Sequence, residues 1–156
     1  MQGTNMGASR SNDLAHQSSL TLASLNAAQR SVVVKTPVQH AYEQWARIED
    51  LPKFITPLRN IKKIDGSQFS FTWHPDGEER QGVFQILLQI PGRRIAWRTL
   101  SNGFMSGVVS FEPRSGSETE VTLKIRSIFD PPNLSQRIEE YLCNFKQLVE
   151  QQESKA

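Results

Sequence analysis

The 156-residue chain contains few histidines and cysteines, side chains that often act as general bases, nucleophiles or metal ligands. Its three histidines, His16, His40 and His74, lie in separate segments, and its single cysteine, Cys143, lies in a fourth. A metal site needs several such ligands at characteristic spacings, which this sequence does not show. We therefore predict no metal ion and interpret each histidine as a solvated surface side chain rather than a general base.

Carboxylates gather around one expected turn, where Asp76, Glu78 and Glu79 are close in sequence. Carboxylates in a turn are usually solvated, and no two of these can be assigned to opposite sides of a substrate. The sequence also lacks a glycine-rich loop between a strand and a helix, which is the usual cradle for a nucleotide phosphate. We therefore assign no catalytic residue and predict no cofactor.

Composition narrows the class of protein further. A single cysteine excludes an internal disulfide, and we expect a reducing, cytoplasmic location. The formal net charge of +2 is too small to indicate nucleic-acid binding. No apolar run approaches the roughly 18 residues required to cross a bilayer. Residues 1–29 are rich in Ser, Asn, Ala and Gln and are expected to form a flexible leader.

The remaining chain alternates between the patterns of strands and helices. A β-branched run predicts a first strand, and apolar residues at helical spacing then predict a helix and a short second helical turn. Six segments with apolar residues at alternate positions follow, and a long amphipathic helix, capped by Asn133, comes last. We predict strands at residues 31–36, 61–64, 69–74, 81–90, 95–99, 108–111 and 121–126, and helices at 38–48, 51–55 and 133–150.

The alternation assigns one face of each strand to a covered interior and the other face to solvent. We expect the inward face to include Phe84, Ile86, Leu88 and Ile90 in one strand, and Val121, Leu123 and Ile125 in another. An antiparallel sheet with a helix on one side meets this demand. Three arginines, Arg80, Arg98 and Arg126, fall on the outer face. A register error of one residue would turn them inward, where they could hold a carboxylate or phosphate group.

Four stretches of this pattern resemble a known family. Residues 38–54 (VQHAYEQWARIEDLPKF) are similar to a pair of helices that ends in leucine-proline-x-phenylalanine, and residues 94–98 (RIAWR) to a central strand. Residues 107–113 (GVVSFEP) are similar to the sixth strand, and residues 145–150 (FKQLVE) to the end of the terminal helix. Together they resemble the polyketide cyclase/dehydrase branch of the START-like (SRPBCC) superfamily, which includes coenzyme Q-binding proteins. The resemblance extends from about Arg30 to Glu150.

The resemblance implies an α+β helix-grip fold. In this fold a seven-stranded curved antiparallel sheet surrounds a long C-terminal helix, and two short helices follow the first strand. We accordingly expect a leader at residues 1–29, one domain at 30–151 and a short tail at 152–156. In the family the two short helices cover the mouth of an internal pocket, so Pro52, Phe54, Ile55 and Pro57 would lie there.

Aromatic residues dominate the expected interior and could either fill it or line a pocket for a flat or branched apolar ligand. The predicted pocket residues are Phe54, Phe71, Trp73, Phe84, Trp97, Phe111, Phe129, Tyr141, Leu142 and Phe145.

Three functions are compatible with this interior. We favour a non-enzymatic binding or carrier protein for a hydrophobic or amphipathic small molecule, such as a lipid, an isoprenoid quinone or a polyketide-like aromatic. The expected partners are that ligand and, transiently, a membrane or protein, but not nucleic acid. The first alternative is a polyketide cyclase/dehydrase-type enzyme, for which Tyr141 is the sole inward candidate. The second alternative is a protein-interaction module with a filled core.

Overall fold

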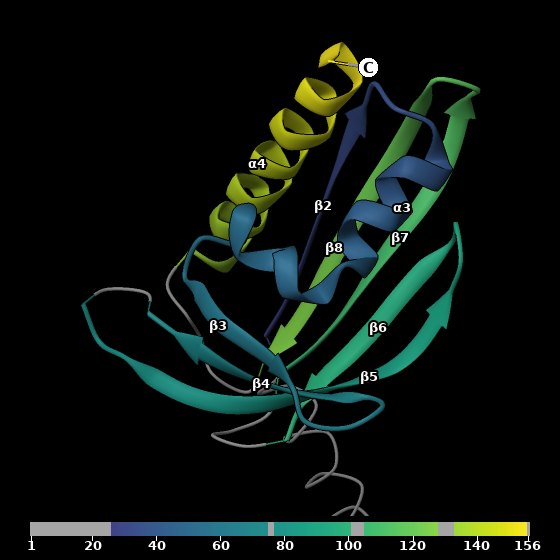
Figure 1. The fold of residues 1–156 in the computed structure, drawn as a ribbon. Coiled ribbons are helices and arrows are strands. Elements are labelled where there is room, and N and C mark those ends of the chain that lie inside the picture. Colours follow the sequence, from purple (N-terminus) through teal and green to yellow (C-terminus); the bar gives the residue numbers. More distant parts are fainter. Residues whose placement is uncertain (1–25, 75–76, 101–104, 128–132, 156) are drawn as a thin grey trace, which may run out of the picture.

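The computed structural model describes residues 26–74, 77–100, 105–127 and 133–155 of the chain. Within these residues the elements are β2 (Asn26–Val34), α3 (Val38–Ala46), the 3-10 helix η1 (Ile48–Lys53), β3 (Leu58–Lys63), β4 (Gln68–Trp73), β5 (Arg80–Ile90), β6 (Arg94–Thr99), β7 (Met105–Ser115), β8 (Glu118–Ser127) and α4 (Leu134–Lys155). The strands form one antiparallel sheet in the order β2-β8-β7-β6-β5-β4-β3. Figure 1 shows the curved sheet with α4 beside β2 and with α3 across β7 and β8. The predicted α+β helix-grip fold is confirmed.

Most element boundaries shift by a few residues from those that the sequence suggested, and two of the shifts cross the expected limits of the domain. Strand β2 begins at Asn26, inside the expected leader, because residues 26–29 pair with residues 124–127 of β8. Helix α4 continues to Lys155, through most of the expected tail. Both extensions depend on partners distant in sequence, which local composition does not reveal. Residues 1–25, the turn residue Asp76 and the predicted pocket residue Phe129 lie outside the described residues.

Alternation holds in β8 and fails in the second half of β5. Val121, Leu123 and Ile125 are buried, as predicted. Leu88 was expected to face inward with Phe84, but it is 40% exposed, and the neighbouring Leu87 is 51% exposed. The pairing of β5 with β6 shifts by one residue between Ile86 and Leu88. A β-bulge of this kind turns the following side chains to the other face, so the prediction for Leu88 was wrong.

An aromatic cluster joins the three helices. The ring centroid of Trp45 on α3 lies 4.8 Å from that of Phe54 and 5.0 Å from that of Phe145 on α4. The Phe54 and Phe145 rings are 5.0 Å apart in an edge-to-face arrangement, which is favourable for aromatic pairs. Asn144 adds a hydrogen bond from its Nδ2 to the Phe54 carbonyl oxygen, at 3.1 Å. The cluster therefore fixes the distance between α3, η1 and α4.

Polar contacts fasten α4 to the end of β2. Lys146 Nζ donates to the Val33 carbonyl oxygen at 2.8 Å and to Glu150 Oε2 at 2.6 Å, and the Lys35 backbone N–H donates to the same Glu150 oxygen at 2.9 Å. Burial raises the pKa of Glu150, but the hydrogen bonds and charges of Lys146 and Lys35 lower it more, and the net shift is downward. The ionised carboxylate is therefore part of the attachment.

This attachment predicts a pH-dependent loss of stability in Glu150→Gln. Since the folded-state pKa lies below the ordinary value, the carboxylate stabilises the fold above that value and loses this effect as the pH falls through the folded-state pKa. At pH 7 we expect the substitution to lower the free energy of unfolding by about 0.5–1 kcal/mol in urea titrations. At pH 3 wild type and variant should differ much less. Glu139→Gln, at an exposed position of the same helix, is the matched control. A Glu150→Gln deficit of equal size at both pH values would contradict the assignment.

Candidate functional site

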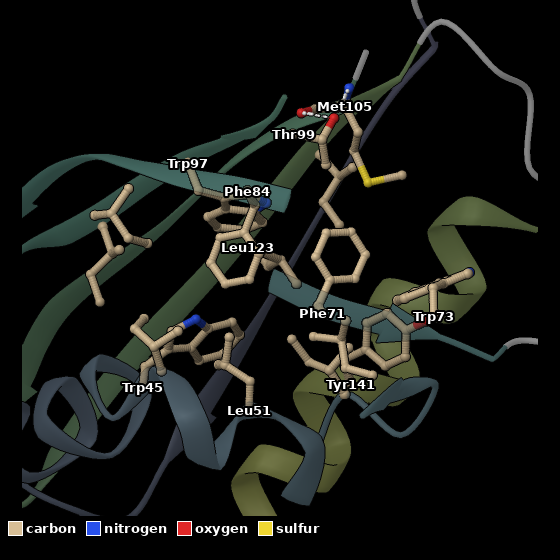
Figure 2. Close-up of a pocket in the computed structure, with 16 residues that line it drawn as sticks. Trp45, Leu51, Phe71, Trp73, Phe84, Trp97, Thr99, Met105, Leu123 and Tyr141 are labelled. Atoms are coloured by element: carbon tan, nitrogen blue, oxygen red, sulfur yellow. Dashed lines mark hydrogen bonds between the residues drawn. The ribbon is translucent and has the colours of Figure 1, made fainter. Parts of the chain in front are cut away.

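An apolar cavity of about 100 Å³ lies between the sheet and the helices. Figure 2 shows side chains from the sheet on one side facing α3, η1 and α4 on the other. All of the strands from β3 to β8 contribute, as do both short helices, the segment that follows them, and α4. The lining residues are Trp45, Ile48, Leu51, Ile55, Leu58, Phe71, Trp73, Phe84, Ile86, Ile95, Trp97, Thr99, Met105, Leu123, Ile125 and Tyr141.

Two hydroxyl groups are present among these lining residues, and none of them carries a charge at neutral pH. Thr99 Oγ1 is held by the backbone of Met105, donating to its carbonyl oxygen at 3.3 Å and accepting from its N–H at 3.0 Å. Burial raises the pKa of Tyr141, a hydrogen bond and charge from Arg137 lower it, Glu140 raises it, and the net shift is upward. The Tyr141 phenol is therefore protonated at neutral pH. The cavity can bind apolar groups, but its described lining offers no charged side chain for acid–base chemistry.

A glycine on β7 determines how Trp97 lies. Gly107 pairs with Trp97 across β6 and β7, and the indole covers the glycine Cα. A Cβ at position 107 would lie within 2.8 Å of three atoms of the Trp97 ring. The absence of a side chain thus lets the indole lie close to the sheet, where it forms a wall of the cavity.

The structure separates the predicted pocket residues into two groups. Phe71, Trp73, Phe84, Trp97 and Tyr141 line the cavity. Four others are not in the lining: Phe54, Phe111, Leu142 and Phe145 are buried in the hydrophobic core. For these four the sequence identified burial correctly but could not distinguish a core position from a cavity wall. Contact between the five lining residues and a ligand stays a prediction.

Sequence reasoning missed part of the helical wall. Trp45, Ile48 and Leu51 line the cavity, but none of them was among the predicted pocket residues. Met105 was also missed, because the strand predicted in this region began only at residue 108, whereas β7 begins at Met105. The sequence did place Trp45 on the apolar face of α3, which indicated that it is buried. It did not indicate that the ring both packs against Phe54 and Phe145 and lines the cavity.

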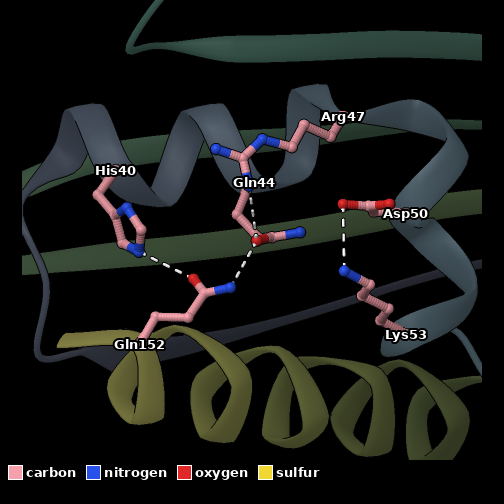
Figure 3. Close-up of polar contacts among 6 residues, drawn as sticks. All are labelled: His40, Gln44, Arg47, Asp50, Lys53 and Gln152. Carbon is pink, nitrogen blue, oxygen red and sulfur yellow. Dashed lines mark hydrogen bonds and ion pairs between the residues drawn. The ribbon is translucent and has the colours of Figure 1, made fainter. Parts of the chain in front are cut away.

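Among the described residues, the histidines and arginines that the sequence singled out are absent from the cavity lining, and His16 lies outside the described residues. His40 is half-buried rather than solvated, and its Nε2 lies 2.9 Å from Gln152 Oε1. Figure 3 shows this contact continuing from Gln152 to Gln44, a chain that links α3 to the end of α4. His74 contacts the Glu78 carbonyl oxygen through Nδ1 at 3.4 Å. As predicted, the three sheet arginines are exposed, namely Arg80, Arg98 and Arg126.

The described residues also lack a cluster of metal ligands and a membrane-spanning helix. No group of three or more His, Cys, Asp or Glu side chains could hold a metal ion in this part of the chain. None of the described helices is both long and apolar enough to cross a membrane.

The curved sheet, the long helix and the apolar cavity between them define a START-like helix-grip protein. The chain belongs to the polyketide cyclase / dehydrase and lipid transport family, whose model matches residues 34–143. It is 27% identical over 111 residues to a 17.2 kDa protein from the melC2-rnhH intergenic region of Streptomyces lincolnensis, covering 70% of this chain and 73% of that one.

Solved structures agree on the fold. DR_A0006 from Deinococcus radiodurans superposes with a TM-score of 0.68 at 26% identity, covering 81% of this chain and 99% of that one. The Zhui aromatase/cyclase from Streptomyces sp. R1128 superposes with a TM-score of 0.70 at 16% identity, covering 82% of this chain and 95% of that one. At the identity of the second pair, the likeness concerns the fold alone.

The contact between Trp97 and position 107 yields a test. We expect Gly107→Ala to lower the free energy of unfolding by about 1–3 kcal/mol, because the added methyl displaces the indole from the sheet. Near-ultraviolet circular dichroism should report the altered tryptophan environment. Gly116→Ala is the matched control, since a Cβ there meets nothing within 4 Å, and it should change stability by less than about 0.5 kcal/mol. Equal stability of the two variants would show that Trp97 does not depend on the glycine.

Proposed function

We propose that this chain binds or carries a hydrophobic or amphipathic small molecule and does not transform it. The observation that carries the proposal is the cavity, whose described lining consists of aliphatic and aromatic side chains together with two hydroxyl groups. Burial of apolar ligand surface supplies roughly 25 cal/mol per Å², without any need for a charged partner. A lipid, an isoprenoid quinone or a polyketide-like aromatic has the required surface.

The size of the cavity sets a condition on this function. An apolar cavity of about 150 Å³ holds benzene in an engineered protein, and pockets for larger ligands usually measure about 300–1,000 Å³. The cavity of about 100 Å³ in this structure is therefore smaller than a typical carrier ligand. Binding of such a ligand requires the lining side chains to move apart. Met105, with an unbranched and flexible side chain, is well suited to that movement.

One observation favours an enzyme of the cyclase type as the second candidate. The Tyr141 phenol is buried, is protonated at neutral pH and lines the cavity, so it could donate a hydrogen bond to the oxygen of an enolising substrate. No second acid or base among the described residues of the lining accompanies it. An interaction module with a filled core is less well supported, because the interior contains a cavity.

The proposal includes transient delivery of the ligand. A membrane or a partner protein would contact the chain transiently to donate or accept the ligand.

The proposal also includes a cytoplasmic location. The ground is that the single cysteine, Cys143, is an exposed free thiol, which a reducing environment preserves.

The carrier function is tested by asking what the protein retains and whether the cavity wall matters. Native mass spectrometry of the purified full chain should reveal a co-purifying hydrophobic molecule. Titration with the neutral dye N-phenyl-1-naphthylamine should show binding with enhanced dye fluorescence. In Trp97→Ala we expect about a tenfold loss of dye affinity, as removal of some 50 Å² of apolar contact would give.

A matched core variant separates binding from folding. Val149→Ala shortens a fully buried side chain that lies outside both the cavity lining and the aromatic cluster, so it should lower the melting temperature while leaving dye affinity within about twofold. Trp97→Ala should lower both affinity and stability, because the indole lines the cavity and packs on Gly107, so the loss of affinity is what distinguishes the two variants. Parallel losses of affinity and stability in both variants, or no binding by wild type, would count against the carrier function.

A further inference from the structure

Two neighbouring turns form a corner of the sheet, which we call the hairpin corner and define as residues 62–67 and 87–94. The first stretch contains the end of β3 and the turn into β4, and the second contains the end of β5 and the turn into β6. The Ile86 N–H donates to the Ser67 carbonyl oxygen at 2.8 Å, so the two stretches lie side by side. The pairing of β4 with β5 ends at Gln85, and beyond it β5 and β6 continue as a two-stranded ribbon (Figure 1).

Exposed aliphatic side chains gather on the hairpin corner. Five large apolar side chains are exposed among the described residues, and three of them lie here. Ile64 is 54% exposed, Leu87 is 51% exposed and Leu88 is 40% exposed. A single exposed apolar residue is ordinary, but several on one corner indicate a surface that contacts an apolar phase or a partner.

Four exposed cations surround these aliphatic side chains: Lys62, Lys63, Arg93 and Arg94. None of the four has an ion-pair partner among the described residues. The one acid of the corner, Asp65, accepts hydrogen bonds from two backbone N–H groups of its own turn at 3.1 Å. The adjoining strand β7 contributes one exposed acid at this end, Glu112. The cations are therefore in excess, and the corner complements an anionic surface.

The hairpin corner also borders a groove of about 680 Å³ that adjoins the apolar cavity. The other side of the groove is the junction of α3 and η1. Four charged side chains at that junction balance one another: Arg47, Glu49, Asp50 and Lys53. Ile48 and Ile86 line both the groove and the cavity, so these two aliphatic side chains lie between the two spaces. A ligand that passed them would leave the cavity at the hairpin corner.

We propose that the hairpin corner docks on an anionic lipid membrane. The inference rests on the proposed carrier function and names the partner with which the ligand is exchanged. Exposed aliphatic side chains can enter the interfacial region of a bilayer while lysine and arginine heads stay at the level of the lipid phosphates. Each cation near an anionic lipid surface strengthens binding about fivefold, and salt screens this attraction. Docking in this orientation presents the groove to the lipid.

The test is flotation of the purified full chain with lipid vesicles. Wild type should bind vesicles of equal parts phosphatidylglycerol and phosphatidylcholine, and should bind pure phosphatidylcholine about tenfold more weakly. High salt should remove most of the binding to the anionic vesicles. We expect the double variant Arg93→Gln/Arg94→Gln to weaken that binding about twentyfold. Ile64→Thr, which removes an exposed aliphatic side chain, should weaken it about fivefold.

The matched controls lie on β2, at the other edge of the sheet. Arg30→Gln removes an exposed arginine there, and Val33→Thr removes an aliphatic side chain that is 40% exposed. Both should leave vesicle binding within about twofold, and thermal unfolding verifies that each variant is folded. The side chains changed on the hairpin corner line neither the cavity nor the groove, so the dye affinity of those variants should equal that of wild type.

Equal binding of wild type to both kinds of vesicle, or equal losses in the corner variants and the β2 controls, would overturn the inference while the carrier function stands. Absence of vesicle binding would also overturn it, and would leave the cations to an acidic protein partner or to protection of the sheet edge against aggregation. Vesicle binding with the expected losses, but without dye binding by wild type, would support the docking surface and count against the carrier function.

Discussion

The aromatic cluster of Trp45, Phe54 and Phe145 is the constraint on which the interior depends. Rings with centroids about 5 Å apart cannot approach further, so they act as a spacer between α3, η1 and α4. The curved sheet continues past this spacer, and the side chains beyond it do not fill the remaining volume. The cavity thus follows from a core that packs tightly at one end. Trp45 belongs to both parts, because it packs in the cluster and also lines the cavity.

The sheet contributes a second constraint, which comes from a missing side chain. Because Gly107 has none, the Trp97 indole occupies the space that a side chain on β7 would take. A large ring placed close to the strand leaves room above it, so a residue that would ordinarily fill a core becomes a wall. The volume of the cavity is therefore sensitive to a single methyl group at position 107.

The architecture could be predicted from the sequence because local patterns carry it: alternation identified the strands, and the final apolar stripe identified α4. The division between core and cavity could not be predicted, since Phe145 and Tyr141 lie on the same stripe, yet Phe145 packs in the cluster and Tyr141 faces the cavity. The difference depends on what lies opposite each ring. The bulge after Ile86 is likewise a property of strand pairing, which is why the burial of Leu88 was misjudged. Resemblance to a family supplied the expectation of a pocket, but not its walls.

The distribution of polarity decides where selectivity can arise. Binding of an apolar body needs only shape and burial, and most of the cavity offers no more than these. A reaction that develops negative charge needs donors aimed at that charge, and recognition of a polar end needs the same. In the described residues both requirements point to Tyr141, whose buried phenol is hydrogen-bonded to Arg137 and lies in the apolar wall. Carrier and cyclase hypotheses therefore differ in what happens at one residue, not in where the ligand lies. The carrier function is favoured because no base accompanies the Tyr141 phenol among the described residues of the lining.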